Sequence, residues 1–430
     1  MSRVHKVQQG DTLGSIAIRY LGSSSKWPKI TGTNPQLASR RKAADGSPLI
    51  YAGDDLIIPE DETAARPASS TSTANTEPIA LSDAEQDITI KIDGQQFTGF
   101  TGYELNLAYD TFDTFSFSAP YCDAMKELRD AIVPFAFKPI DIYYDGALVL
   151  KGTLLTPDPE LADKSGEITL QGYPLCGILN DSMVPPTKYP LECMGINMKG
   201  IAEAACDPYS IPVVFDGDIG PDFTEVSIEP TEKIMDFLTK LAKQRNLLFS
   251  NTEKGELLFF TAKDKKAFAT FTEGKTPLLS IKPKFAAQEF FSHITGFSKT
   301  EAEYPSYSFT LENKYLINKG IMRHHSITVE DAENENDLAN SVRAYAGRMF
   351  ADCVSFELEC DGHLNADGER FKKGIGVCVL APTAMITRET DFIARNIKLM
   401  RTAETGKTAT LTLVLPGSYT GELPEAFPWE

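Results

Sequence analysis

The sequence has no apolar run of the roughly 18 residues that a membrane-spanning helix needs, so we expect no membrane span. The first residues, MSRVHKVQQGDTL, lack the apolar core of a signal peptide, so we expect no export by that route. Only 7 of 430 residues are cysteine, and no two have CxxC spacing. A disulfide framework or a zinc site is therefore not expected. Cys122, Cys176, Cys206 and Cys378 stand among apolar or small residues, so we predict that each is a small buried apolar residue of a chain that folds in a reducing cytoplasm.

Sequence motifs of catalysis are also missing. The chain has no G-x-S-x-G, no P-loop, and no G-x-G-x-x-G that opens a helix after a strand. It has five histidines, of which His324 and His325 form the sole cluster. Asp331 and Glu333 lie near in sequence but form no recognised ligand motif with the pair, so we interpret the two histidines as part of a surface strand. We therefore predict no catalytic residue, no cofactor and no metal.

The composition that remains is that of a globular protein. Hydrophobic residues make up 42% and charged residues 24%, and the length fits about three domains. The net charge of −18 is uneven: residues 1–60 carry +3, residues 61–86 carry −4 and residues 87–430 carry −17. The acidic long part argues against tight nucleic-acid binding. It is compatible with a surface that must not adhere to DNA.

Residues 61–86 mark the clearest boundary in the chain. This segment, DETAARPASSTSTANTEPIALSDAEQ, is rich in Ser, Thr, Ala, Pro and acids and has no large apolar residue before Ile79. Such a composition cannot bury enough apolar surface to offset the entropy of ordering. We predict a flexible, disordered linker between a module of residues 1–60 and a long body.

Within the body, short alternating segments predict two regions rich in strands. In residues 87–185 they are Ile88–Ile92, Tyr103–Leu107, Thr114–Ser118, Ile140–Tyr144, Ala147–Leu150 and Glu167–Leu170. In residues 263–430 they include Val354–Glu359, Gly376–Leu380, Phe392–Met400 and Ala409–Val414, with a helix at about Glu333–Phe350. Many short strands with turns between them favour a barrel or a sandwich.

Residues 186–262 have a different pattern. Asn197–Cys206 predicts a short helix followed by a strand at Pro212–Phe215. A second helix opens at Pro230–Lys233, with its apolar face at helical spacing and Asn246 at its end. The strands Leu247–Phe249 and Glu256–Phe260 form a hairpin. The predicted fold class is multidomain α+β, with two β-barrel-like tube domains around this small α+β domain.

The N-terminal module has a βααβ pattern that resembles a LysM domain. The matching motifs, in order, are V-x-x-G-D-T-L from Val7, I-A-x-R-Y from Ile16, N-P at Asn34, and G-D-D-L-I-I-P from Gly53. LysM domains commonly bind N-acetylglucosamine polymers such as peptidoglycan. The family's groove maps here onto Gly10, Asp11, Thr12, Leu13, Ile30, Ile50, Tyr51, Ala52, Gly53 and Asp54.

The module departs from the family at Gln36–Pro48. This stretch is longer than the usual linker and carries Arg40-Arg41-Lys42. A basic loop of this kind favours an acidic protein surface as the partner. Two partners therefore stay open for the module: a protein neighbour, which we favour, and peptidoglycan.

The body resembles the late-control D family, which contains hub proteins of Mu-like and P2-like contractile phage tails. Residues 231–261 carry the main likeness: a helix ending L-x-x-L-A-x-x-x-N, a strand, a Gly turn and L-x-F-x. The order helix, strand, Asp361-Gly362, G-x-G-V-x-V and two long strands follows in residues 341–418. The likeness covers roughly residues 87–418 and rests on pattern more than on single residues.

The resemblance implies a homotrimer in which each subunit contributes two barrel-like tube domains to a ring around a channel. Such a ring adapts a trimeric spike to the hexameric tail tube, beside baseplate wedge or sheath proteins. DNA would pass through the channel without being bound. We expect the acidic body to present an acidic lumen, with acids that merely solvate the outer surface as the alternative.

Other functions stay open from the sequence. LysM as a glycan anchor would suit a cell-wall hydrolase, although catalytic motifs are missing. Type VI and extracellular injection particles share the hub fold, and the sequence does not choose among phage, tailocin and injection particle. The resemblance places the chain in a virion tail baseplate assembled in the host bacterial cytoplasm.

Overall fold

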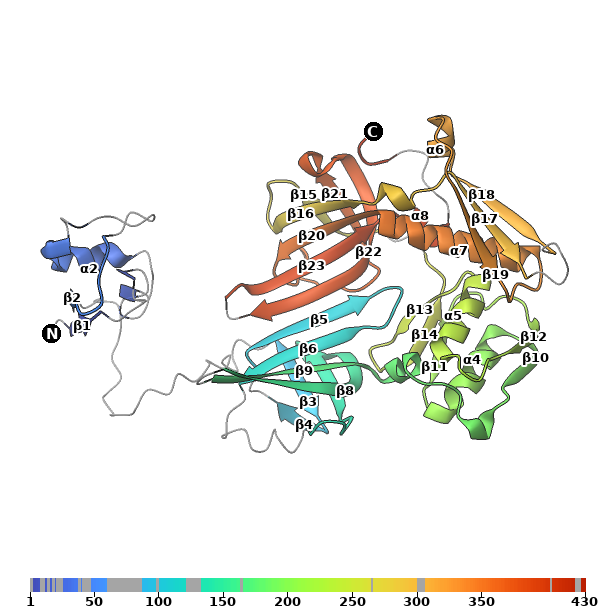
Figure 1. Cartoon of the computed structure of the whole chain (residues 1–430), viewed down its shortest axis with the longest axis horizontal. Helices are drawn as coiled ribbons and strands as arrows, with labels where there is room; N and C mark the ends of the chain where they lie inside the picture. Colours follow the sequence, from blue (N-terminus) through green and yellow to red (C-terminus); the bar gives the residue numbers. More distant parts are fainter. Residues whose placement is uncertain are drawn as a thin grey trace. The chain divides into compact units, whose positions relative to one another are not determined.

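The structure is a computed structural model of the whole chain (Figure 1). It describes residues 3–7, 12–13, 16–17, 20, 26–37, 40, 48–59, 87–97, 100–120, 133–162, 165–263, 266–299, 306–402, 404–421 and 427–430. The chain divides into two compact units, Met1–Asn75 and Thr76–Glu430. The predicted linker at residues 61–86 lies outside the described residues.

The N-terminal unit contains a two-stranded antiparallel sheet and a helix. Its described elements are β1 (Arg3–Lys6), α2 (Trp27–Thr33) and β2 (Asp55–Ile58). Ile16, Ala17 and Tyr20 are also helical, within the helix that the sequence predicts at Ser15–Tyr20, and Leu13, predicted at the end of a strand and turn, is helical as well. Val7, Leu13, Ile16, Leu37, Leu56 and Ile58 are among the buried residues of its core.

The body is mixed α and β and consists mostly of strands. Its helices are α4 (Met198–Cys206), α5 (Ile234–Gln244), α6 (Lys314–Asn318), α7 (Glu335–Cys353) and α8 (Gly417–Thr420). Its strands are β3 (Ile88–Ile92), β4 (Gln95–Phe97), β5 (Gly102–Ala108), β6 (Thr114–Pro120), β7 (Pro139–Tyr144), β8 (Ala147–Ala162), β9 (Ser165–Pro174), β10 (Glu192–Ile196), β11 (Val213–Asp216), β12 (Phe223–Ser227), β13 (Leu248–Asn251), β14 (Leu257–Phe260), β15 (Ala267–Thr272), β16 (Leu278–Phe285), β17 (His293–Ser298), β18 (Ser308–Glu312), β19 (His324–Val329), β20 (Val354–Asp361), β21 (Gly376–Ala381), β22 (Ile386–Thr402) and β23 (Gly406–Val414).

One sheet of 13 strands joins the two β-rich regions that the sequence predicts as separate barrels. Its path is β16-β20-β23-β22-β5-β6-β9-β8-β7-β3-β4, and β21 and β15 extend it beside β22. The join is the antiparallel pair β5–β22, with Leu107 opposite Ile397 and Leu105 opposite Leu399 (Figure 1). Within the described residues no strand path closes on itself. The two predicted regions are therefore confirmed as rich in strands, but among these residues neither forms a closed barrel. The pairing of β5 with β22 satisfies the backbone hydrogen-bonding groups of two strands that would otherwise be exposed sheet edges.

The two faces of this sheet differ in chemistry. One face packs a continuous core that draws on both regions and includes Phe117, Leu170, Phe356 and Leu411. On the central strands β23, β22, β5, β6 and β9, the opposite face carries mostly hydroxyl and amide side chains, which the strand register places side by side: Asn106, Thr114, Ser116, Ser118, Thr169, Gln171, Asn396, Thr410 and Thr412. Toward β16 and β8 the same face carries charged residues: Lys282, Lys284, Glu357, Glu359, Asp158 and Glu160. Such alternation is typical of an antiparallel sheet with one solvated face.

The small α+β region follows the sequence prediction closely. β11, β14 and β13 form one sheet, and β10 pairs with β12. The two apolar helices α4 and α5 share its core with Phe223, Leu257 and Phe259. Helix α5 starts at Ile234, later than predicted, because Lys233 forms a bridge with Met183 and stays extended.

A three-stranded sheet, β18-β17-β19, packs against the long helix α7. Ile294 of β17 is buried beside Leu338, Val342 and Ala346 of that helix. Figure 1 shows α7 running from the large sheet to this small one. The helix therefore links the large sheet to the sheet β18-β17-β19.

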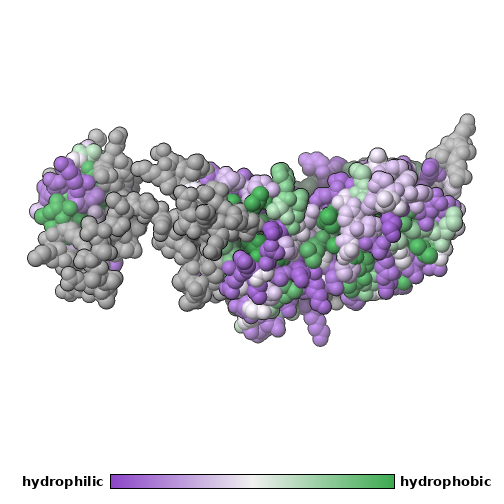
Figure 2. Space-filling view, turned by 90° about the horizontal axis from the view of Figure 1, so that it is seen from below, coloured by the Kyte–Doolittle hydropathy of each residue, from purple (hydrophilic) through white to green (hydrophobic). Residues whose placement is uncertain are grey.

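The surface of the body mixes hydrophilic and hydrophobic residues on the side seen in Figure 2. No helix in the described part of the chain is long and apolar enough to cross a membrane.

Candidate functional site

The predicted LysM groove is framed by the ends of β1 and β2. The Gly53 amide donates to the Val7 carbonyl at 2.8 Å, and the Val7 amide donates to the Asp54 carbonyl at 2.8 Å. Gly53 has a φ of 99°, which L side chains rarely adopt. The turn before β2 is therefore held against the end of β1, as the G-D-D motif predicts.

Asn34, the first residue of the N-P motif, has a structural role in the module. Its side chain is fully buried and donates to the carbonyls of Ile30 at 2.7 Å and Ile57 at 2.6 Å. It also accepts a hydrogen bond from the Ile57 amide at 2.8 Å. One side chain thus satisfies backbone groups of both α2 and β2 and fixes the helix against the strand.

The structure separates the predicted groove residues into three groups. Leu13 and Ile30 are 1% and 0% exposed, so they are core residues and offer no exposed wall. Gly10 and Asp11 lie outside the described residues. The remaining residues form one exposed or half-buried stretch beside the turn, together with the exposed Thr12: Ile50, Tyr51, Ala52, Gly53 and Asp54.

Arg40, from the long basic stretch Gln36–Pro48, contacts the turn before β2. Its guanidinium forms an ion pair with Asp54 and lies 5.3 Å from the ring centre of Tyr51. The hydrogen bond from Arg40 holds the pKa of the Asp54 carboxyl below its ordinary value. Because Arg40 is engaged within the module, docking by the basic loop would depend on Arg41 and Lys42, which lie outside the described residues.

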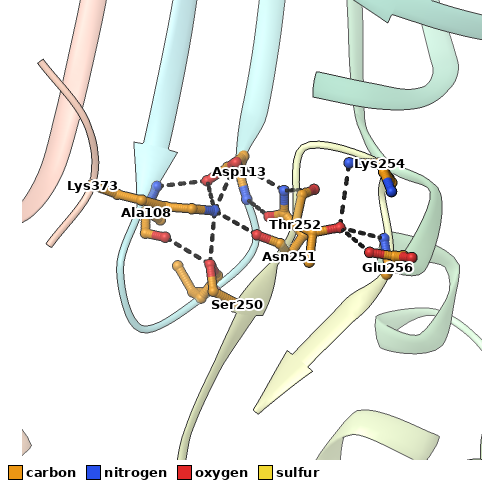
Figure 3. Close-up of polar contacts among 9 residues, drawn as sticks. Ala108, Asp113, Ser250, Asn251, Thr252, Lys254, Glu256 and Lys373 are labelled. Carbon is orange, nitrogen blue, oxygen red and sulfur yellow. Dashed lines mark hydrogen bonds and ion pairs between the residues drawn. The ribbon is translucent and has the colours of Figure 1, made fainter. Parts of the chain in front are cut away.

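A polar network joins the three regions of the body (Figure 3). Asp113, which precedes β6, is 2% exposed and accepts from the Ala108 amide at 2.7 Å and from the side chain of Asn251 at 2.8 Å. Lys373, which precedes β21, donates to both carboxylate oxygens of Asp113 at 2.9 Å. Lys373 also donates to Ser250 Oγ and to the Asn251 carbonyl, both at 2.9 Å.

Sequence reasoning missed this network. Asp113 lies 138 residues from Asn251 and 260 residues from Lys373, and no local pattern links the three. Their contact fixes the large sheet against the hairpin β13–β14 of the α+β region. The network is therefore a structural joint between these two parts of the body.

A second charged network surrounds Asp87, the first described residue of the body. The Tyr103 hydroxyl donates to both oxygens of Asp87 at 3.2 Å, and Lys407 Nζ lies 3.1 Å away. His363 Nδ1 lies 3.7 Å from the same carboxylate. Burial would raise the pKa of Asp87, but the contacts with His363 and Lys407 outweigh it and hold that pKa well below its ordinary value. The network ties β3 to the C-terminal β-rich region.

We expect Asp87→Asn to lower the free energy of unfolding by about 2 kcal/mol near neutral pH. An aspartate whose folded pKa is depressed contributes stability above its unfolded pKa of about 4 and loses it at lower pH. Urea unfolding of the full chain followed from neutral to acid pH measures this. The difference between wild type and variant is expected to shrink below about pH 4, and a difference that persists there contradicts the assignment.

The histidine pair lies in a strand, and most of the described cysteines are packed within the fold. His324 and His325 lie on β19, where His325 Nε2 contacts the Tyr345 hydroxyl at 2.9 Å. Among the described residues no group of three His, Cys, Asp or Glu could hold a metal ion. Five of the six described cysteines are buried, whereas Cys378 on β21, predicted to be buried, is partly exposed. Cys122 lies outside the described residues. Burial raises the pKa of Cys206 and Cys360 to about 12, so these thiols are neutral at physiological pH.

Two family models match parts of the chain. Residues 5–59 match the LysM domain, and residues 176–261 match the second domain of the baseplate hub protein gp44-like family. The second match coincides with the α+β region that carries β13–β14 and α5. A comparison with the curated proteins finds no match.

Solved structures share the fold of the body at low identity. The 43 kDa tail protein of prophage MuSo2 from Shewanella oneidensis is 19% identical, with a TM-score of 0.66, over 78% of this chain and 100% of that one. A tail protein from Neisseria meningitidis MC58 is 18% identical with a TM-score of 0.66, over 78% and 98%. A component of the Escherichia coli type VI secretion system is 10% identical with a TM-score of 0.50, over 76% of each chain.

These matches confirm the resemblances to LysM domains and to phage tail hub proteins that the sequence indicates. The chain therefore carries an N-terminal LysM domain and a domain of the baseplate hub gp44-like family, within a body that has the fold of phage tail proteins.

Proposed function

We propose that this chain is a structural hub of a contractile phage-type tail baseplate. The observation that carries the proposal is the match of residues 176–261 to a baseplate hub domain, in the region that the polar joint holds against the large sheet. Its work would be assembly and symmetry adaptation, driven by burial between subunits and not by catalysis. We place it in the virion baseplate, assembled in the host bacterial cytoplasm.

In this proposal three copies form a ring that joins a trimeric spike to a hexameric tail tube. Residues 87–185 and 263–430 serve as two barrel-like tube domains, residues 186–262 as the α+β domain, and residues 61–86 as the linker to the LysM module at residues 1–60. The open sheet supports this, because among the described residues its strand path ends at β4, β15 and β16, and an end strand can pair with a neighbouring copy.

DNA would pass through the ring without being bound. The solvated face of the large sheet supports this, since its central strands carry mostly hydroxyl and amide groups there. On the central strands its Lys398 is paired with Glu104 at 2.9 Å, and the exposed Lys282 and Lys284 lie on the end strand β16 opposite Glu357 and Ser355. Each unpaired cation in a bore would add salt-dependent attraction to phosphate. We keep an acidic lumen as the proposal for the ring as a whole, because the body carries −17.

Sedimentation of the full chain with its spike and tube proteins tests the ring. The expected result is a species with three copies of this chain that binds both neighbours. A chain that stays at the mass of one copy at high concentration, and binds neither neighbour, contradicts the proposal.

For the LysM module we propose docking onto a baseplate wedge or sheath protein, with peptidoglycan as the alternative. Deletion of residues 1–60 is then expected to lower the yield of complete particles several-fold while the body still folds. Particle counts by electron microscopy measure this, and an unchanged yield contradicts docking. Tyr51→Ala distinguishes the two partners. Tyr51 is 59% exposed, so if the wild-type module binds peptidoglycan and this variant does not, the glycan is favoured as the partner.

A hub of a type VI or extracellular injection particle is the second candidate function. The fold shared with the Escherichia coli type VI component favours it. A cell-wall hydrolase stays as the enzymatic alternative, and lysis of peptidoglycan by the purified body in a turbidity assay would support it against the hub.

A further inference from the structure

An open cleft of about 660 Å³ lies beside helices α5 and α7 and belongs to none of the networks above. Its lining includes Lys240 and Lys243 of α5 and Arg348 of α7. Met235 and Phe249, which are nearly buried, contribute apolar surface to it. The volume falls within the range of about 300–1,000 Å³ that is usual for ligand sites.

The two helices are held at a fixed separation by contacts just outside the cleft. Arg245 and Asp337 form an ion pair at 2.6 Å, with side chains only 2% and 4% exposed. Asn340 donates to the Gln244 carbonyl at 3.0 Å. The cleft is therefore preformed by rigid elements, which reduces the entropy that a ligand would lose on binding.

Two of the three cations in the cleft form no ion pair with the carboxylates that also line it. Lys240 is paired with Glu232 at 2.6 Å. By contrast, among the described residues neither Lys243 nor Arg348 has a hydrogen-bond or ion-pair partner for its side chain, although both are half-buried. Two neighbouring half-buried cations without a partner are unusual, because burial of unpaired charge is costly.

The environment of Lys243 is unfavourable for its charge. Burial lowers the pKa of Lys243, and the positive charges of Arg348 and Lys240 lower it further. Lys243 lies in the last turn of α5, where the helix dipole favours a cation. That effect accounts for a lysine at this position, but it does not account for Arg348, which lies within α7.

The other charges of the cleft restrict the ligand. Glu229 and Asp236 also line it, and they would repel a phosphate chain or a nucleic acid, in keeping with the acidic body. They would tolerate a single carboxylate that is followed by apolar or basic residues, with apolar side chains against Met235 and Phe249. This charge complementarity favours a peptide over a small polyanion.

We propose that this cleft binds a peptide segment of a partner protein with a single carboxylate among apolar and basic residues, and that Lys243 and Arg348 receive this carboxylate. The proposal goes beyond the hub function and does not depend on whether three copies close into a ring. It assigns a docking point to the α5–α7 side of the body.

Fluorescence anisotropy of the full chain with a labelled, end-blocked peptide Leu-Glu-Leu-Lys-Leu tests the proposal. The matched control peptide has Gln in place of Glu, and inorganic phosphate is a separate probe. The Glu peptide is expected to bind at least about tenfold more tightly than the Gln peptide, and Lys243→Met or Arg348→Met is expected to remove this preference. Lys254→Met, at an exposed lysine outside the cleft, is expected to leave it unchanged.

The stability of the variant gives an independent measurement. Without peptide, Lys243→Met is expected to raise the unfolding midpoint of the full chain by about 1–2 °C, because it removes an unpaired cation. A lower midpoint would make Lys243 part of the fold and overturn the proposal. Equal binding of both peptides, binding unaffected by Lys243→Met and Arg348→Met, or tighter binding of phosphate than of the Glu peptide would also overturn it.

Discussion

Asp113→Ala is expected to lower the free energy of unfolding of the body by about 3–5 kcal/mol. The change leaves the Lys373 ammonium without its counter-ion and removes the acceptor of the Ala108 amide and of the Asn251 side chain. Removal of one partner of a buried, hydrogen-bonded charge is costly because the other partner stays desolvated. Urea unfolding followed by circular dichroism measures the loss.

A matched control compares the loss of stability at this buried network with the loss at an exposed ion pair. Lys199 and Glu203 form an exposed pair at 3.8 Å on α4, and Lys199→Met is expected to cost less than about 0.5 kcal/mol. A loss for Asp113→Ala that is no larger than this would contradict the view that the network fixes the α+β region against the large sheet.

Arg245→Met is expected to have an effect of similar size, about 3–5 kcal/mol, because it leaves the carboxylate of Asp337 buried without a partner. Arg245 also lies 3.7 Å from the ring centre of Phe223, so its replacement removes a cation–π contact as well. The double variant Arg245→Met with Asp337→Leu is expected to recover most of the loss. A double variant as unstable as the single one would contradict the charge explanation.

The loss in Arg245→Met is expected to depend on pH. Burial raises the pKa of Asp337, and the ion pair with Arg245 opposes that rise. Without the arginine, the charged carboxylate of Asp337 destabilises the folded state at pH values above its raised pKa. Protonation of Asp337 removes this destabilisation as the pH falls through that pKa. The difference between wild type and variant should therefore narrow on acidification, as unfolding at several pH values measures.

Local pattern was sufficient to predict the elements whose periodicity is clear. Helices α4 and α5 and the hairpin β13–β14 lie within a few residues of their predicted positions, because each has an apolar face at regular spacing and a turn signal at its end. Gly255, at a φ of 79°, closes the hairpin as its Glu-Lys-Gly sequence indicates. By contrast, β10 and β12 escaped prediction, since the polar segment Phe223–Ser227 has no alternation beyond Phe223 and Val226.

Contacts between residues far apart in the sequence could not be predicted from local patterns. Nothing local indicates that β5 pairs with β22 or that Asp113 contacts Lys373, because these partners are joined only by the folded body. The LysM groove illustrates the same limit at short range. A family motif located Leu13 and Ile30, but their burial in the core of a small module follows from packing that the motif does not describe.

Cryo-electron microscopy of a particle that contains the chain tests the hub most directly. The account predicts three copies around a bore, with the solvated face of the β5–β22 sheet turned inward, the spike on one side and the tail tube on the other. A map in which the chain is a single peripheral copy, away from the axis of the tail, would contradict it.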